Sequence, residues 1–476
     1  MRLRFSLLLL CLAASLIGRA DVANYTLAYD GGNVVHVRAE VTVGDDGRLL
    51  IGQFGGIDHL PNQWATFVTD LRVENGSVEL LGKEGWRTDA RGRVVLRYDV
   101  GLSYAEGAWP AGNEQAGRRF PRALYTITKP LFVYSPASDS AEVVFELPER
   151  WEIAAPWRAL SRRRFAVKNM TSLTENSIVL GEFPRRTVRV GAFNMTIATP
   201  SEKAIPPELE RLVAQTAAMT TRLFPDTPPD DYLMTFFRES SEDGEAFDSS
   251  AAFTSPESFD RSSLMVTGHT VVHELFHYWI GHKIHAGDRE RLAWFTEGFT
   301  DYYATRVMFA SGVLTSAEVG ARIGNRLTGY EYFFASPLFE GVSLAGAGKR
   351  KGSYRLGVYN GGWMVALALD VRIRQATSGA ASLDDVMRKL FATHGLTNTA
   401  VAEQDIIAAT SAAFGESAEP FFARYVDARE ALPTTELMRT LGWRVIGQPY
   451  AAEMYVLDGE PRNALRSAIF GGRVGR

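Results

Sequence analysis

The fold of this chain is decided by the stretch Val271-Val272-His273-Glu274-Leu275-Phe276-His277-Tyr278-Trp279-Ile280. Two histidines four residues apart on a helix project from one face, so both ring nitrogens can reach a single metal ion. Glu274 lies beside the first histidine, where it can reach a metal-bound water without ligating the metal. The flanking residues are apolar and predict a buried helix, in which three polar side chains are costly unless something satisfies them.

The pattern His-Glu-x-x-His is a signature of zinc peptidases, although five residues alone also fit an ordinary helix with two histidines. The sequence downstream supplies a third ligand, Glu297, on a second predicted helix, after a turn around residues 286–288. Asp301 follows one helical turn later and is predicted to fix the tautomer of a ligating histidine; the alternative is a charge on the helix surface. The only cysteine, Cys11, lies in a predicted signal segment. Histidines and carboxylates must therefore hold the expected single Zn²⁺.

Three segments together resemble the gluzincin zinc metallopeptidases, and within them the glycyl aminopeptidase family without its PDZ module. They are His273-Glu-x-x-His277-x-Trp279, Trp294-Phe-Thr-Glu297-Gly-Phe-Thr300 and Val358-Tyr359-Asn360-Gly361-Gly362. The resemblance implies peptide-bond hydrolysis with His273, His277 and Glu297 as zinc ligands and Glu274 as general base. It assigns stabilisation of the oxyanion to Tyr359. A core tyrosine is the alternative reading of Tyr359, because Tyr330, Tyr332 and Tyr354 lie nearby in the sequence.

Two departures from the family pattern concern specificity. Gly361 stands where the family has lysine, which removes a positive charge near the site. The stretch 244–251 lacks a glutamate at the spacing expected for gripping a substrate's free amine, and Glu245 and Asp248 are the candidates for that contact. An aminopeptidase is therefore the first hypothesis. The alternatives are an endopeptidase, an amide or epoxide hydrolase, and a catalytically silent zinc- or peptide-binding protein on the same fold.

The length of 476 residues predicts two or three domains. Alternating apolar segments separated by turn signals predict a β-sandwich-like N-terminal domain over residues 21–198, with part of one mixed domain as the alternative. Helical periodicity dominates after residue 268, and the resemblance implies a thermolysin-like, mainly helical catalytic domain over residues 199–430. A short extension covers 431–476. The expected fold class is multidomain α+β.

Residues 1–20 have the layout of a cleavable signal peptide, with arginines, an apolar core and a small-residue exit. This predicts a secreted or periplasmic protein; a retained membrane anchor is the alternative, although the apolar core is short for a span. No other stretch predicts a membrane span. The formal net charge of −4 gives no support for a nucleic-acid partner. A peptide substrate is the expected partner, and the sequence does not specify an oligomeric state. His269 is a candidate neighbour of the ligands, and Lys349-Arg350-Lys351 is expected to be solvated surface flanking the cleft.

Overall fold

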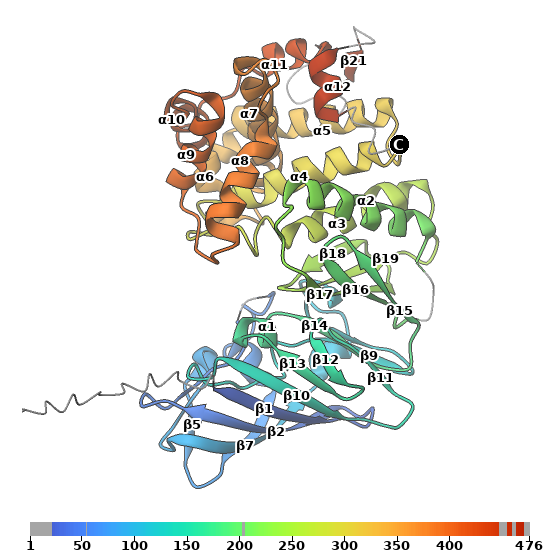
Figure 1. Ribbon diagram of the computed structural model, residues 1–476, viewed down its shortest axis with the longest axis vertical. Helices are drawn as coiled ribbons and strands as arrows, with labels where there is room; N and C mark the ends of the chain where they lie inside the picture. The colour runs from blue at the N-terminus through green and yellow to red at the C-terminus, as the bar shows by residue number, and fades with distance from the viewer. Residues whose placement is uncertain (1–20, 54, 202–204, 447–454, 459–462, 471–476) are drawn as a thin grey trace, which may run out of the picture.

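The computed structural model describes residues 21–470 apart from 54, 202–204, 447–454 and 459–462. A β-rich N-terminal part is followed by a mainly helical part, which confirms the expected α+β class (Figure 1). The predicted signal peptide lies outside the described residues, as does part of the C-terminal extension. Among the described residues, no helix combines the length and apolar character needed to cross a membrane.

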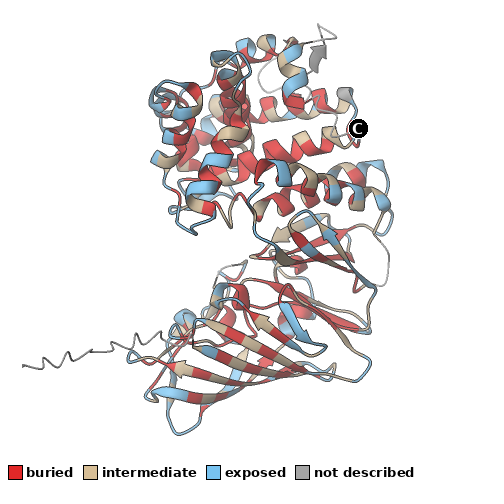
Figure 2. Ribbon diagram, viewed as in Figure 1, coloured by how far each residue is buried: buried red, intermediate tan, exposed pale blue. Residues whose placement is uncertain are grey.

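The N-terminal part consists of two packed sheets and a small third one. The larger sheet has the order β12 (Arg158–Ser161), β13 (Arg164–Val167), β10 (Ser140–Glu146), β1 (Val22–Ala28), β2 (Val34–Val43), β7 (Gly92–Gly101) and β4 (Val68–Val73). The second has the order β11 (Glu152–Ala154), β14 (Ser177–Gly181), β9 (Ala123–Ile127) and β8 (Gly117–Arg119); the third has β3 (Arg48–Leu49), β6 (Trp86–Thr88) and β5 (Val78–Leu80). Buried and more exposed residues alternate along β2 and β7 (Figure 2), as in a sheet with one face on a core.

A five-stranded sheet connects the two parts. Its order is β15 (Arg185–Val190), β16 (Phe193–Ala198), β17 (Asp230–Arg238), β19 (Ser250–Ser255) and β18 (Asp243–Ala246), with β18 antiparallel at one edge. β15 and β16 precede the expected boundary at residue 198, yet β16 pairs with β17 beyond it. Phe193, Met195 and Ile197 of β16 belong to the core of the helical part. β15 and β16 therefore belong to the five-stranded sheet and not to the N-terminal sheets, and the domain limits remain predictions.

The helices cover this sheet on the side away from the N-terminal part (Figure 1). The longer ones are α2 (Pro207–Leu223), α3 (Arg261–His277), α4 (Ala293–Ala310), α5 (Ser316–Ala335), α7 (Gly362–Ala376), α8 (Leu383–Leu390) and α9 (Glu403–Phe414). The shorter ones are α6 (Leu344–Ala347), α10 (Glu419–Phe422), α11 (Thr434–Thr440) and α12 (Ala464–Phe470). Helix α1 (Met170–Thr174) lies in the N-terminal part, and β20 (Trp443–Ile446) pairs with β21 (Tyr455–Asp458). Asp260 caps α3 by accepting a hydrogen bond from Ser263 N at 2.9 Å. Nearly all of α4 is buried (Figure 2), so polar side chains on it require partners.

Candidate metal centre

Helix α3 carries two histidines, His273 and His277, whose Nδ1 atoms both form hydrogen bonds. His273 Nδ1 donates to Asp301 Oδ1 at 2.9 Å, and His277 Nδ1 donates to the carbonyl oxygen of Ile280 at 2.9 Å. Each ring therefore carries its lone pair on Nε2. The two Nε2 atoms lie 2.9 Å apart. Two lone pairs that face each other at this distance repel, so the arrangement fits a cation held by both nitrogens.

Glu297 on α4 completes a ligand set of three. Its Oε2 atom lies 3.2 Å from His273 Nε2 and 3.5 Å from His277 Nε2. Ligands at about 2.0–2.1 Å from a tetrahedral zinc are separated from one another by about 3.3 Å. The three separations here agree with that value, so these residues fit Zn²⁺. Burial would raise the pKa of Glu297, but His277 and the hydrogen bond with His273 hold it well below its usual range.

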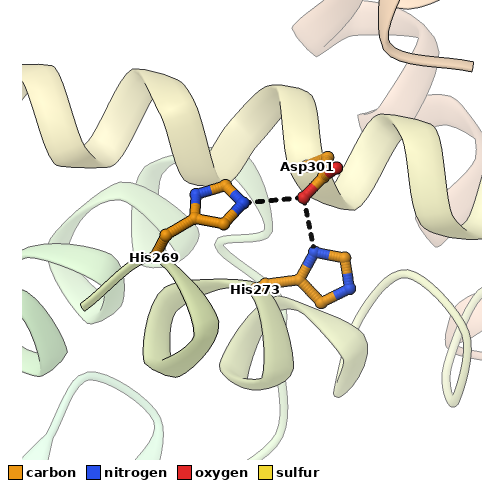
Figure 3. Close-up of side chains that lie close together, drawn as sticks. All are labelled: His269, His273 and Asp301. Atoms are coloured by element: carbon orange, nitrogen blue, oxygen red, sulfur yellow. Dashed lines mark hydrogen bonds and ion pairs between the residues drawn. The ribbon is translucent and has the colours of Figure 1, made fainter. Parts of the chain in front are cut away.

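Asp301, one turn after Glu297, lies between two histidines of α3 (Figure 3). Its Oδ1 accepts hydrogen bonds from His269 Nε2 at 2.8 Å and from His273 Nδ1 at 2.9 Å, and Arg326 Nη2 lies 2.5 Å from Oδ2. His269, His273 and Asp301 are close enough to be considered as a metal site of their own. We favour the hydrogen-bonded network, because one carboxylate oxygen accepting two ring N–H groups accounts for both short distances.

Glu274 lies beside the ligands and opens onto a cavity of about 1150 Å³ between the two parts of the chain. Burial raises the pKa of Glu274, against the opposing influence of His273 and His277. A carboxylate with a raised pKa, close to a metal-bound water, has the properties of a general base. The cavity is also lined by residues of the N-terminal part: Ile51, Gly52, Gln53, Gln115, Lys129 and Glu175.

Tyr359 is the tyrosine that the structure places at the metal centre. Its ring centroid lies 6.2 Å from that of His273, and it lines the cavity. The other three candidates point elsewhere: the Tyr330 hydroxyl accepts a hydrogen bond from Leu432 N, and Tyr332 and Tyr354 contact Phe339. Burial raises the pKa of Tyr359, so its hydroxyl keeps a proton that it can donate.

The segment of Tyr359 is a π-helical turn, Leu356–Gly361, that leads into α7. Two glycines bring it close to α4: a Cβ at Gly298 would lie 2.3 Å from Gly362 Cα, and a Cβ at Gly362 would lie 1.9 Å from Trp294 O. Only glycine at both positions allows the two backbones to touch. This contact fixes Tyr359 relative to the ligand Glu297.

Glu245 and Asp248, the candidates for contact with a substrate amine, both line the cavity but differ in their neighbours. Asp248 lies 3.7 Å from Lys168 Nζ and accepts a hydrogen bond from Ser249 Oγ at 3.1 Å. Glu245, on edge strand β18, has no ion pair among the described residues. Burial and the nearby Glu274 raise the pKa of Glu245 to about 7. Of the two carboxylates, Glu245 is therefore the one that lacks an ion-pair partner among the described residues.

Two charged residues of the site were not identified as such from the sequence. Arg326 on α5 holds Asp301, and its helical position carries no signal of that role. For Lys351 the sequence predicts solvated surface flanking the cleft; the side chain is half exposed, but its Nζ donates to Glu297 Oε1 at 2.6 Å. The local sequence around Lys351 does not indicate that its partner is Glu297, because only the tertiary fold brings α4 beside this turn.

Comparison with known proteins shows similarity at the level of the fold. No family model and no curated protein sequence matches the chain. A solved aminopeptidase N family protein from Idiomarina loihiensis is 17% identical with a TM-score of 0.70, over 90% of this chain and 79% of that one. A mutant M1 zinc metallopeptidase from Deinococcus radiodurans, bound to a Tyr-Ser-Ala substrate, is 14% identical with a TM-score of 0.57, over 87% and 95%. Aminopeptidase A from Legionella pneumophila, in complex with aspartic acid, is 12% identical with a TM-score of 0.52, over 86% and 49%. The chain thus has the fold of M1 zinc metallopeptidases.

Proposed function

We propose that this protein is a zinc-dependent aminopeptidase that hydrolyses the first peptide bond of peptides with a free N-terminus. The observation that carries the proposal is the convergence of His273 Nε2, His277 Nε2 and Glu297 Oε2 within 2.9–3.5 Å of one another. Glu274 and Tyr359 border the same cavity. Neighbours of the same fold include a zinc metallopeptidase bound to a tripeptide substrate, which supports the substrate class.

In this proposal each residue of the site has a separate role in peptide hydrolysis. A bound Zn²⁺ would acidify a water and polarise the scissile carbonyl. Glu274 takes the proton of the attacking water and passes it to the leaving amine. The Tyr359 hydroxyl donates a hydrogen bond to the carbonyl oxygen as negative charge develops there. Asp301 holds the His273 ring in the tautomer that leaves Nε2 free.

Glu245 supplies the preference for a free N-terminus. It lies on an edge strand in the cavity and has no cation paired with it among the described residues, so a substrate ammonium would provide the missing positive charge. Its pKa of about 7 would fall once that ammonium is bound, because an opposite charge favours the ionised carboxylate. A signal peptide on residues 1–20 remains part of this proposal and would place the enzyme in a secreted or periplasmic setting.

A peptide panel tests the proposal. Zinc-loaded protein is incubated with a set of tripeptides, each with a free and with an acetylated N-terminus, and the products are identified by mass spectrometry. We expect release of the first residue from the free peptides only. We also expect Glu245→Gln to raise KM for free peptides about 10-fold or more, as loss of a charged contact does, whereas Asp248→Asn has a smaller effect.

The panel also separates the alternatives. Internal cleavage of acetylated peptides at a similar kcat/KM would identify an endopeptidase. Non-peptide amides and epoxides are assayed beside the peptides, and turnover of these compounds alone would identify another hydrolase on the same site. No turnover of any substrate by protein with bound zinc would favour the catalytically silent reading and refute the proposal.

A further inference from the structure

The two oxygens of Glu297 have different surroundings. Oε2 lies 3.2 Å from His273 Nε2 and 3.5 Å from His277 Nε2, on the side of the metal ligands. Oε1 accepts a hydrogen bond from Lys351 Nζ at 2.6 Å. The Glu297 side chain is only 10% exposed, whereas that of Lys351 is 46% exposed. A buried ligand is therefore held from the solvent side by a cation on the cavity rim.

The backbone that carries Lys351 is fixed against the helix that carries Glu297. A Cβ at Gly348 would lie 1.9 Å from Glu290 O, so the turn before Lys351 is pressed onto the residues that precede α4. Leu344 and Ala347 of α6 are buried in the same place. The ammonium group is thus not placed by a long free side chain alone, because its backbone belongs to the same packed unit as Glu297.

The turn also packs against Gly361, where the resemblance leads one to expect a lysine. A Cβ at Gly361 would lie 2.5 Å from Leu344 Cδ2, and Leu344 opens the segment that ends in Lys351. The segment that brings one cation to the ligand thus occupies the space a larger side chain at position 361 would need. The positive charge absent at Gly361 is present at the metal centre from another point in the chain.

Carboxylates surround the position of the Lys351 ammonium. Glu245, Glu274 and Glu297 all exert an attractive influence on it, and Lys351 also lies 5.6 Å from the ring of Tyr359. Arg355 lies over the same ring at 4.8 Å, and of the two cations it is Lys351 that contacts Glu297. Without Lys351, Oε1 of Glu297 would lose its hydrogen-bond donor while the carboxylates of Glu245 and Glu274 remain nearby. The Glu297 carboxylate could then rotate out of its ligating orientation.

We propose that Lys351 is a positioning residue for the metal centre: its hydrogen bond to Glu297 Oε1 holds that carboxylate so that Oε2 alone faces the metal. The inference rests on the proposed zinc site, but not on the reaction at it. The opposing effect is repulsion between the ammonium and Zn²⁺, which solvent screens because the lysine is half exposed. Orientation of a ligand by its hydrogen-bond partner is typically worth 10- to 100-fold in metal affinity, so orientation outweighs repulsion.

The test measures zinc affinity of the full chain by competition with a chromophoric chelator. Lys351→Met removes the charge and keeps the length, Lys351→Arg keeps a donor, and Lys349→Met removes a neighbouring exposed charge. We expect the zinc Kd to rise about 10-fold in Lys351→Met, to be largely restored in Lys351→Arg and to be unchanged in Lys349→Met. Metal-free Lys351→Met should remain folded, with a melting temperature lowered only modestly because Glu297 Oε1 loses its donor; a purely structural role would lower the melting temperature without changing the zinc Kd.

A zinc Kd in Lys351→Met that equals or lies below that of wild type would overturn the inference. Lys351→Gln gives the same measurement should the methionine variant fail to fold. Peptide hydrolysis is scored separately: absence of turnover in the wild-type protein counts against the proposed function, whereas the ratio of zinc affinities still decides the role of Lys351.

Discussion

Replacing Glu114 by glutamine should remove a pH-dependent loss of stability. Glu114 lies in a 3-10 turn (Asn113–Gln115), next to the cavity-lining Gln115, and is fully buried. Neither of its carboxylate oxygens has a hydrogen-bond partner among the described residues. Burial raises its pKa from 4.5 to about 8, and Asp243, Glu245 and Glu239 contribute in the same direction.

The size and sign of the effect follow from the two pKa values. The unfolded chain releases the Glu114 proton near pH 4.5, whereas the folded chain keeps it to about pH 8. Between these values the folded state binds more protons, so the free energy of unfolding falls as pH rises, by up to about 1.4 kcal/mol for each pH unit. Between pH 6 and pH 8 the wild-type protein should lose up to about 3 kcal/mol from this group. Below pH 4.5 and above pH 8 the contribution is constant.

The assay is urea unfolding of the metal-free protein at pH 5.5, 6.5, 7.5 and 8.5. We expect Glu114→Gln to gain stability over wild type progressively with pH, because glutamine cannot ionise and has nearly the same shape. Glu79→Gln, a change at an exposed position on β5, is the matched control and should shift stability equally at every pH. A constant difference between Glu114→Gln and wild type across the four pH values would refute the reasoning.

Four further variants test the metal centre and its support. Glu274→Gln should bind zinc normally yet lose about 10²- to 10⁴-fold in kcat, the usual worth of a general base; retained hydrolysis would exclude that role. Tyr359→Phe should lower kcat about 10²-fold with KM little changed, and an effect confined to KM would contradict oxyanion stabilisation. Asp301→Asn should raise the zinc Kd about 10- to 100-fold in chelator competition, and an unchanged Kd would place Asp301 outside the site. Gly298→Ala should cost about 1–3 kcal/mol in urea unfolding, because its Cβ would lie 2.3 Å from Gly362 Cα, whereas Gly320→Ala on α5 has open space and should be near neutral.

The parts of the fold that could be predicted are those with strong local patterns. The helix of His273 and His277 follows from its apolar flanks, and the helix of Glu297 from the run that begins at Trp294; both exist as α3 and α4. β15 and β16 lie in the region 21–198, for which alternation predicts strands, but their sheet could not be assigned. Alternation specifies which residues face a core and carries no information about which core it is.

Some residues of the candidate site could be predicted from local sequence, whereas others depend on tertiary packing and could not. Residues four apart on one helix, such as His273 and His277, share a face by geometry alone. Lys351 and Arg326 reach Glu297 and Asp301 from distant segments, through a turn and a helix that only tertiary packing brings near. Glu114 could not be anticipated either, because glutamate is rarely buried without a partner and nothing in its neighbourhood marks it as an exception.

The close approach of Gly298 and Gly362 has a consequence for how such an enzyme could change. The third ligand and Tyr359 stand on two helices that touch backbone to backbone, so they form one rigid half of the reaction chamber. The opposite half includes Gln53, Gln115 and Lys129 of the β-rich N-terminal part, which has a hydrophobic core of its own. Substitutions in that half can reshape the space for a substrate while the distances among the reacting groups stay fixed. Apart from the amine contact proposed for Glu245, the preference for substrate side chains could therefore change through the N-terminal part while the metal centre stays the same.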